Sequence, residues 1–82
     1  MDFNEAMIDG VYDGNLLKLI LWKDLGATNF EEALLIAASC GYLKIVKLCK
    51  EWGATNFEFA MNLAMDHGHL EIARLCREWL NE

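Results

Sequence analysis

One six-residue stretch of this chain occurs twice. The stretch Gly26–Glu31 (Gly-Ala-Thr-Asn-Phe-Glu) returns letter for letter as Gly53–Glu58, 27 residues later, and more than half of the positions up to Trp52 and Trp79 are identical. A fainter copy precedes them. Self-similarity at a fixed period of this length is typical of stacked units, each too small to bury its apolar face alone. We therefore divide the chain, as one domain over residues 1–82, into three approximate copies: residues 1–25, 26–52 and 53–82.

Each copy predicts two helices joined at a glycine. In the second copy, Asn29 precedes an apolar stripe of helical period, and Glu32 follows three residues later, which is the spacing of a capping box. Gly41 stands where a left-handed residue would end that helix, and a second amphipathic helix follows it. Strand signals are absent. The pattern predicts an all-α fold of six helices, over residues 3–12, 15–24, 30–39, 42–51, 57–66 and 69–79.

Composition narrows the class of protein. With 82 residues, of which 55% are hydrophobic, the chain is long enough to bury one core, and it contains no Pro and no linker-like break. The net charge of −6 opposes binding to nucleic-acid phosphates, which requires a basic surface. No apolar run approaches the ~18 residues that span a bilayer. We expect a soluble, cytoplasmic protein with a protein partner, and no nucleic-acid or membrane partner.

The three cysteines do not suggest a disulfide framework, because their number is odd. Cys49 and Cys76 occupy the same position in two copies, on the apolar stripe of the second helix. We expect both to be buried, reduced thiols that react slowly with thiol reagents. Reduced thiols in the core favour a cytosol-like compartment.

The segment Ala37–Ala54 resembles the second half of an ankyrin repeat, and Gly68–Ala73 is similar to the Gly-His turn and following helix of that family. Two features depart from the family. Its repeat of about 33 residues carries a β-hairpin, for which the shorter unit here leaves no room after Gly-Ala. Its Thr-Pro-Leu-His opening is replaced by the pair Asn29 and Glu32. Short repeats without hairpins that contain Gly-Ala-Thr-Asn-Phe resemble those of large double-stranded DNA viruses of protists, such as the marseilleviruses.

This resemblance covers nearly the whole chain. It implies an ankyrin-like helical solenoid of three helix-turn-helix repeats, without β-hairpins. It also implies a protein-interaction scaffold, and a viral protein that works in the host cytoplasm or in the virion. It does not identify a ligand, and the missing hairpins are the parts with which many ankyrin proteins contact theirs.

The end copies differ from the middle copy as caps would. In the first copy, Asp9 and Lys18 stand where the second has Ile36 and Ile45. Polar residues are expected on the outer face of a terminal repeat, which no neighbour covers. At the end of the third copy, Leu80 stands where Gly26 and Gly53 follow the first and second copies. These differences predict a complete array.

Only the stretch Asp66-His67-Gly68-His69 groups residue types that bind metal ions. Cys40 and Cys76, which could also be ligands, lie elsewhere in the chain. A zinc site needs four convergent ligands, usually in closely spaced pairs. His69 already has an explanation as the Gly-His turn residue, and His67 as a favourable charge at a helix end. No nucleophile and base in a catalytic order, phosphate-binding Gly loop or paired-carboxylate motif is present. We expect no catalytic residue, no metal and no cofactor.

Apolar residues that replace polar ones in the other copies are the candidates for an interaction surface. Leu17 and Ile20 stand where later copies have charged residues, and they lie three residues apart on one helix. Phe59 replaces a Glu at the start of the fifth helix. These three side chains either meet a partner or are buried locally by the geometry of the end copies. Trp52 and Trp79 fill the core beside the connections or anchor a partner at that edge.

Two functions follow from these candidates. The first is a non-enzymatic adaptor whose helical surface binds a host or viral protein. The alternative is a structural component of a virion or assembly that self-associates, as a homo-oligomer, through its ends or through Leu17 and Ile20. Size-exclusion chromatography with light scattering separates the two, because a discrete monomer favours the adaptor.

Overall fold

The computed structural model describes residues 2–82, and they form six α-helices. No strand occurs within this range, so the predicted all-α fold is confirmed. The observed helix ends lie within one residue of the predicted ones. The helices are α1 (Phe3–Tyr12), α2 (Leu16–Asp24), α3 (Phe30–Cys40), α4 (Leu43–Glu51), α5 (Phe57–Asp66) and α6 (Leu70–Leu80).

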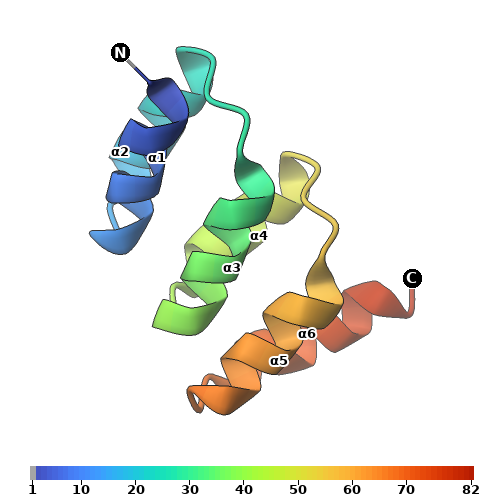
Figure 1. The fold of residues 1–82 in the computed structure, drawn as a ribbon. Coiled ribbons are helices and arrows are strands. Elements are labelled where there is room, and N and C mark those ends of the chain that lie inside the picture. The colour runs from blue at the N-terminus through green and yellow to red at the C-terminus, as the bar shows by residue number, and fades with distance from the viewer. Residues whose placement is uncertain (1) are drawn as a thin grey trace.

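The six helices pair as three antiparallel hairpins that lie side by side in chain order (Figure 1). α1, α3 and α5 form one layer, and α2, α4 and α6 form a second layer behind it. Consecutive hairpins contact each other mainly through the first layer, where α3 lies between α1 and α5. The first-layer helices carry buried alanines, such as Ala33, Ala37 and Ala60, and small side chains let helix axes approach closely. The molecule measures 35 × 24 × 16 Å.

Side-chain caps explain where the first three helices begin. Asp2 accepts hydrogen bonds from the backbone N–H groups of α1, and Asn15 accepts one from α2. At α3, Asn29 Oδ1 accepts from the N–H of Glu32 at 3.3 Å, which confirms the predicted cap. The Glu32 carboxylate does not return to the backbone as in a capping box. It accepts from the Asn29 side-chain amide at 2.6 Å, because the Asn29 N–H is bonded to Asn4.

Gly41 ends α3 in the left-handed conformation, with φ 86°, as the sequence predicts. A second constraint acts there, because a Cβ at this position would lie 2.6 Å from the ring of His69 in the next hairpin. Gly68, the equivalent residue of the third copy, has φ 80° and open space around it. The glycine at position 41 is therefore required both by backbone conformation and by close approach.

One core runs through all three hairpins, and it contains both thiols expected there. Cys49 and Cys76 are fully buried and free, whereas Cys40 is exposed. Burial raises the pKa of Cys49 to about 12, with a smaller contribution from the negative charge of Glu31. Burial also raises the pKa of Cys76 to about 11. Both thiols therefore stay protonated, and unreactive, at neutral pH.

When the native protein is mixed with a chromogenic disulfide reagent at pH 8, we expect one thiol to react fast and two to react slowly. Cys40 reacts fast because it is exposed, and Cys49 and Cys76 react only when the fold opens. A Cys40→Ser variant serves as the control and loses only the fast phase. Rapid modification of either remaining thiol in the folded variant would contradict the buried placement.

Candidate interaction surfaces

Leu17 lies on α2 with 79% of its surface exposed, as the comparison between copies predicts. Ile20, the second candidate on this helix, is half-buried. Exposed apolar surface instead continues to Leu21 on α2 and to Leu25 just after it, which are 55% and 50% exposed. The pattern i, i+4, i+8 places Leu17, Leu21 and Leu25 along one side of the helix. We call these three residues the α2 stripe.

Phe59 is not part of the α2 stripe. It lies on α5, in the other layer and in the third hairpin (Figure 1), with 55% of its surface exposed. The candidates proposed from the sequence therefore occupy separate surfaces.

Trp52 and Trp79 are half-buried in contacts within the chain. Trp52 packs against Phe30 with ring centroids 5.2 Å apart, and Trp79 packs against Phe57 at 5.1 Å. A lysine of the preceding copy also lies over each ring: the ammonium of Lys23 is 5.5 Å from the centroid of Trp52, and that of Lys50 is 5.4 Å from Trp79. These contacts fill the edge of the core and join consecutive copies.

The first copy builds the same aromatic pair differently. Phe3 packs against Trp22, with ring centroids 5.8 Å apart. At the position of Trp52 the first copy has Leu25, and its tryptophan, Trp22, lies three residues earlier. Alignment of the copies by the 27-residue period therefore did not predict that Phe3 and Trp22 pair. A spacing of 19 residues between Phe3 and Trp22, compared with 22 in the later copies, still places both rings at the open end of the hairpin.

A polar contact made from the start of α1 recurs at the start of α3. Glu31 accepts from the backbone N–H groups of Thr55 at 3.0 Å and Asn56 at 3.1 Å, and from the Thr55 hydroxyl at 3.0 Å. Asn4, one period earlier, accepts in the same way from Thr28 and Asn29 at 2.7 and 2.9 Å. Each copy thereby holds the connection that leads into the next copy.

The hydrogen bonds of this contact favour the ionised form of the Glu31 carboxyl group. Partial burial acts to raise the pKa of Glu31, but the hydrogen bonds from Asn56 and Thr55 outweigh it, so the pKa lies below its ordinary value. A carboxyl with a lowered folded-state pKa stabilises the fold above its unfolded pKa, near 4.3. That stabilisation is lost as the pH falls through the folded pKa. The contact is therefore fully formed at neutral pH.

A third contact joins the turns of neighbouring hairpins. The Tyr42 hydroxyl donates to the carbonyl oxygen of Tyr12 at 3.2 Å, and His69 Nε2 lies 3.1 Å from the carbonyl oxygen of Ser39. Because a carbonyl oxygen can only accept, His69 Nε2 carries the proton. His69 therefore has a structural partner at the end of α3, in agreement with its interpretation as the turn residue.

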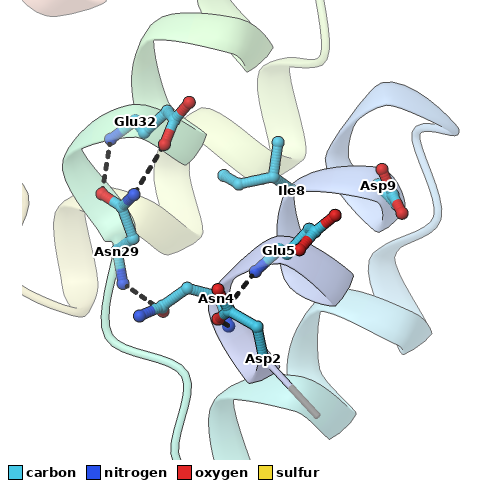
Figure 2. Close-up of a pocket in the computed structure, with 7 residues that line it drawn as sticks. All are labelled: Asp2, Asn4, Glu5, Ile8, Asp9, Asn29 and Glu32. Carbon is cyan, nitrogen blue, oxygen red and sulfur yellow. Dashed lines mark hydrogen bonds between the residues drawn. The ribbon is translucent and has the colours of Figure 1, made fainter.

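An open acidic groove lies between the starts of α1 and α3, and Figure 2 shows its lining side chains. Its volume is about 320 Å³. The hydrogen bonds between Asn29 and Glu32 form one wall, and Asp2 caps α1 at another. Exposed carboxylates attract basic side chains only weakly in salt, so the groove favours, but does not select, a basic partner. The groove is lined by Asp2, Asn4, Glu5, Ile8, Asp9, Asn29 and Glu32.

The third hairpin exposes apolar side chains at positions that are buried or half-buried in the first two hairpins. Met65 is 54% exposed, whereas Val11 and Ala38, at the same position of the earlier copies, are fully buried. Leu70 is 70% exposed, and a depression of about 240 Å³ lies between it and α5. The expected polar cap is therefore present in the first copy and not in the third. The depression is lined by Met61, Met65, Leu70, Ala73, Arg74 and Arg77.

Neither a metal centre nor a membrane span is formed by residues 2–82. No three His, Cys, Asp or Glu side chains within this range are grouped so that they could hold a metal ion. The longest helices, α3 and α6, have 11 residues, and no helix in the range is long and apolar enough to cross a membrane. Comparison with protein-family models, with curated proteins and with solved structures finds no match for this chain.

Proposed function

We propose that this chain is a non-enzymatic protein-interaction module, built as a solenoid of three ankyrin-like repeats without β-hairpins. In this proposal it is an adaptor of a large DNA virus, and it binds a host or viral protein in the host cytoplasm. The α2 stripe carries the proposal, because a solvent-facing helix of a small monomer seldom presents three exposed leucines in line.

The recurring contacts between copies support the solenoid. The polar contact made by Asn4 and Glu31, and the cation–π contact made by Lys23 and Lys50, each occur twice at the same spacing. In a solenoid, neighbouring units use the same interface again and again. The Gly-Ala-Thr-Asn-Phe stretch supports the viral origin, and the two buried, free thiols are consistent with a reducing compartment.

The α2 stripe is suited to protein recognition rather than to chemistry. Leu17 is 79% exposed, and Lys44 and Glu71 occupy its position in the later copies. Water disfavours exposed apolar surface by about 25 cal/mol per Å², so a partner that covers the stripe gains affinity from its burial. Lys18 and Asp24 flank the stripe with both signs of charge, as in the polar rim of an interface.

The second candidate function is self-association as a structural component. The exposed Met65 and Leu70 on the third hairpin favour it, because they add an apolar surface at one end of the molecule. A discrete monomer in light scattering at micromolar concentration favours the adaptor. An oligomer that dissociates when the α2 stripe or Met65 is changed favours self-association.

Replacing Leu17 by Lys is expected to abolish partner binding and to leave the fold intact. The side chain is exposed, and Lys is at least as good a helix former as most residues, so the free energy of unfolding should change by less than about 0.5 kcal/mol. Binding is measured by affinity capture from infected host cells, with quantification of each captured protein. A Glu71→Lys variant, changed at the same position of the third copy, is the matched control.

A protein retained by the wild type and by Glu71→Lys, and lost from Leu17→Lys, is the partner of the α2 stripe. If every captured protein is retained equally by both variants, and the wild type is monomeric, the stripe is not an interaction surface.

A further inference from the structure

Each of the first two copies offers the same set of groups to the copy that follows it. A side chain at the start of the first helix accepts from the next connection, as Asn4 and Glu31 do. A lysine near the end of the second helix lies over the next tryptophan, and the carbonyl oxygen at the end of the first helix accepts from the next turn. Four apolar side chains lie in the face between them, in the first copy Met7, Val11, Leu16 and Leu19.

The third copy carries the corresponding set, and no further hairpin within residues 2–82 packs against it. Met65 and Leu70 are exposed and Met61 is half-buried, whereas Ala73 is already buried. Glu58 stands at the position of Asn4 and Glu31, and Arg77 at that of Lys23 and Lys50, and both are exposed. No side chain within residues 2–82 bonds to the carbonyl oxygen of Asp66, which is equivalent to that of Ser39. We call this set the open face, and its apolar members are Met61, Met65, Leu70 and Ala73.

The leading face of a copy is the side that contacts the preceding copy. In the first copy, this face does not complement the open face. Asn15 stands where Tyr42 and His69 reach back to the previous hairpin, and its side chain is used to cap α2. Lys18 stands where Ile45 is buried, and burying its charge would cost more than the contact gains. Stacking of identical copies end to end is therefore disfavoured, and Asp9 and Leu25 replace two further contact residues, Ile36 and Trp52.

We propose that the open face binds one further helix-turn-helix unit of this same type, whose side facing it carries the residues that the second copy presents to the first. Glu58 accepts from two backbone N–H groups of the unit's entering connection, as Glu31 does. Arg77 lies over a tryptophan at the unit's end, as Lys50 does over Trp79. The apolar members of the open face pack against alanine and isoleucine side chains of the unit.

The contacts already made between the chain's own hairpins argue for this occupant. They show which groups the open face would meet, because Glu58 and Arg77 carry the same charges at the same positions as Glu31 and Lys50. The inference rests on the proposed function as a protein-interaction module, but it concerns a different surface from the α2 stripe. The two can therefore be tested separately.

Binding to this surface is tested with a variant of the full-length chain, called the probe. In the probe, residues of the first copy are replaced by those with which the second copy contacts the copy before it. The substitutions are Asp9→Ile, Asn15→Tyr, Lys18→Ile and Leu25→Trp, all at positions that are not buried. A fifth change, Met65→Glu, blocks the probe's own open face and prevents it from polymerising. Binding of the probe to the wild-type chain is measured by sedimentation equilibrium.

We expect a 1:1 complex of probe and wild type, and a monomer for the wild type alone. Met65→Glu in the wild-type chain should weaken the complex by about 10-fold or more, because a carboxylate would be buried without a partner. Arg77→Ala should weaken it less, through loss of the cation–π contact. Leu17→Lys should leave it unchanged, so that failure of the α2 stripe and failure of the open face are distinguishable.

Absence of a complex with a probe that is helical and melts cooperatively would overturn the proposal. So would a wild-type dimer that Met65→Glu dissociates, because the occupant would then be a second copy. If the probe does not fold, a lengthened chain decides the question. In it, residues 80–82 are replaced by a second copy of residues 53–82, in a Cys40→Ser background with Met65→Cys. The Met65→Cys thiol should react about 10-fold more slowly than in the chain of normal length, and equal rates would overturn the proposal.

Discussion

Replacing Leu34 by Ala is expected to lower the free energy of unfolding by about 2–5 kcal/mol. Leu34 is among the largest fully buried side chains and lies on α3, the helix between α1 and α5. Truncation removes its apolar surface from the core and leaves a cavity that three packed helices cannot readily close. Urea denaturation followed by circular dichroism measures the loss.

Met61→Ala is the matched control for this prediction. Met61 occupies the position of Leu34 in the third copy, but no further hairpin within residues 2–82 covers it, and it is half-buried. Its truncation should cost about 1 kcal/mol, because solvent already reaches the side chain. Equal losses at both positions would mean that α5 contributes little to the burial of Leu34. A Met61→Ala loss larger than that of Leu34→Ala would contradict the placement of the open face.

Replacing Gly41 by Ala is expected to cost about 2–4 kcal/mol, the second large effect. A left-handed conformation costs a residue with a Cβ about 1–2 kcal/mol, and Gly41 has φ 86°. The added Cβ would also lie 2.6 Å from the ring of His69, so the ring must move and lose its hydrogen bond to Ser39. Thermal and urea unfolding of the variant measure the loss.

Two variants separate the backbone cost from the steric one. Gly68→Ala, at φ 80° and with open space around the new Cβ, should show only the backbone cost of about 1–2 kcal/mol. In a His69→Ala background, Gly41→Ala should cost no more than Gly68→Ala. If Gly41→Ala is no worse than Gly68→Ala in the wild-type background, the hairpins approach less closely at this turn than the structure has them.

Local features of the sequence determined the helices. Asn29 with Glu32, and Gly41 with Gly68, mark helix starts and ends through contacts within a few residues, so the pattern alone located them within one residue. The burial of Cys49 and Cys76 also followed from the sequence, because helical period places them on the apolar stripe. The exposure of Leu17 followed from comparing copies, since a charged residue at the same position of another copy indicates a solvent face.

The candidate surfaces depended on more than local pattern. Ile20 is half-buried although Lys47, at the same position of the second copy, is exposed, and Leu21 is exposed although Leu48 is half-buried, so the first copy does not repeat the burial pattern of the second. Met65 is exposed where Ala38 is buried, because no further hairpin within residues 2–82 lies beside α5. The pairing of Lys23 with Trp52 joins two copies, and no spacing within one helix predicts it.

The amino-acid sequence by itself therefore determined the all-α class, the helix boundaries and the inward side of each helix, because hydrogen-bonded caps and helical periodicity act within a few residues. The tertiary structure decided which apolar side chains remain in solvent and which polar groups join consecutive hairpins. Those outcomes depend on contacts between residues about 20 to 30 positions apart, and a neighbouring hairpin can cover a side chain only where the fold places it.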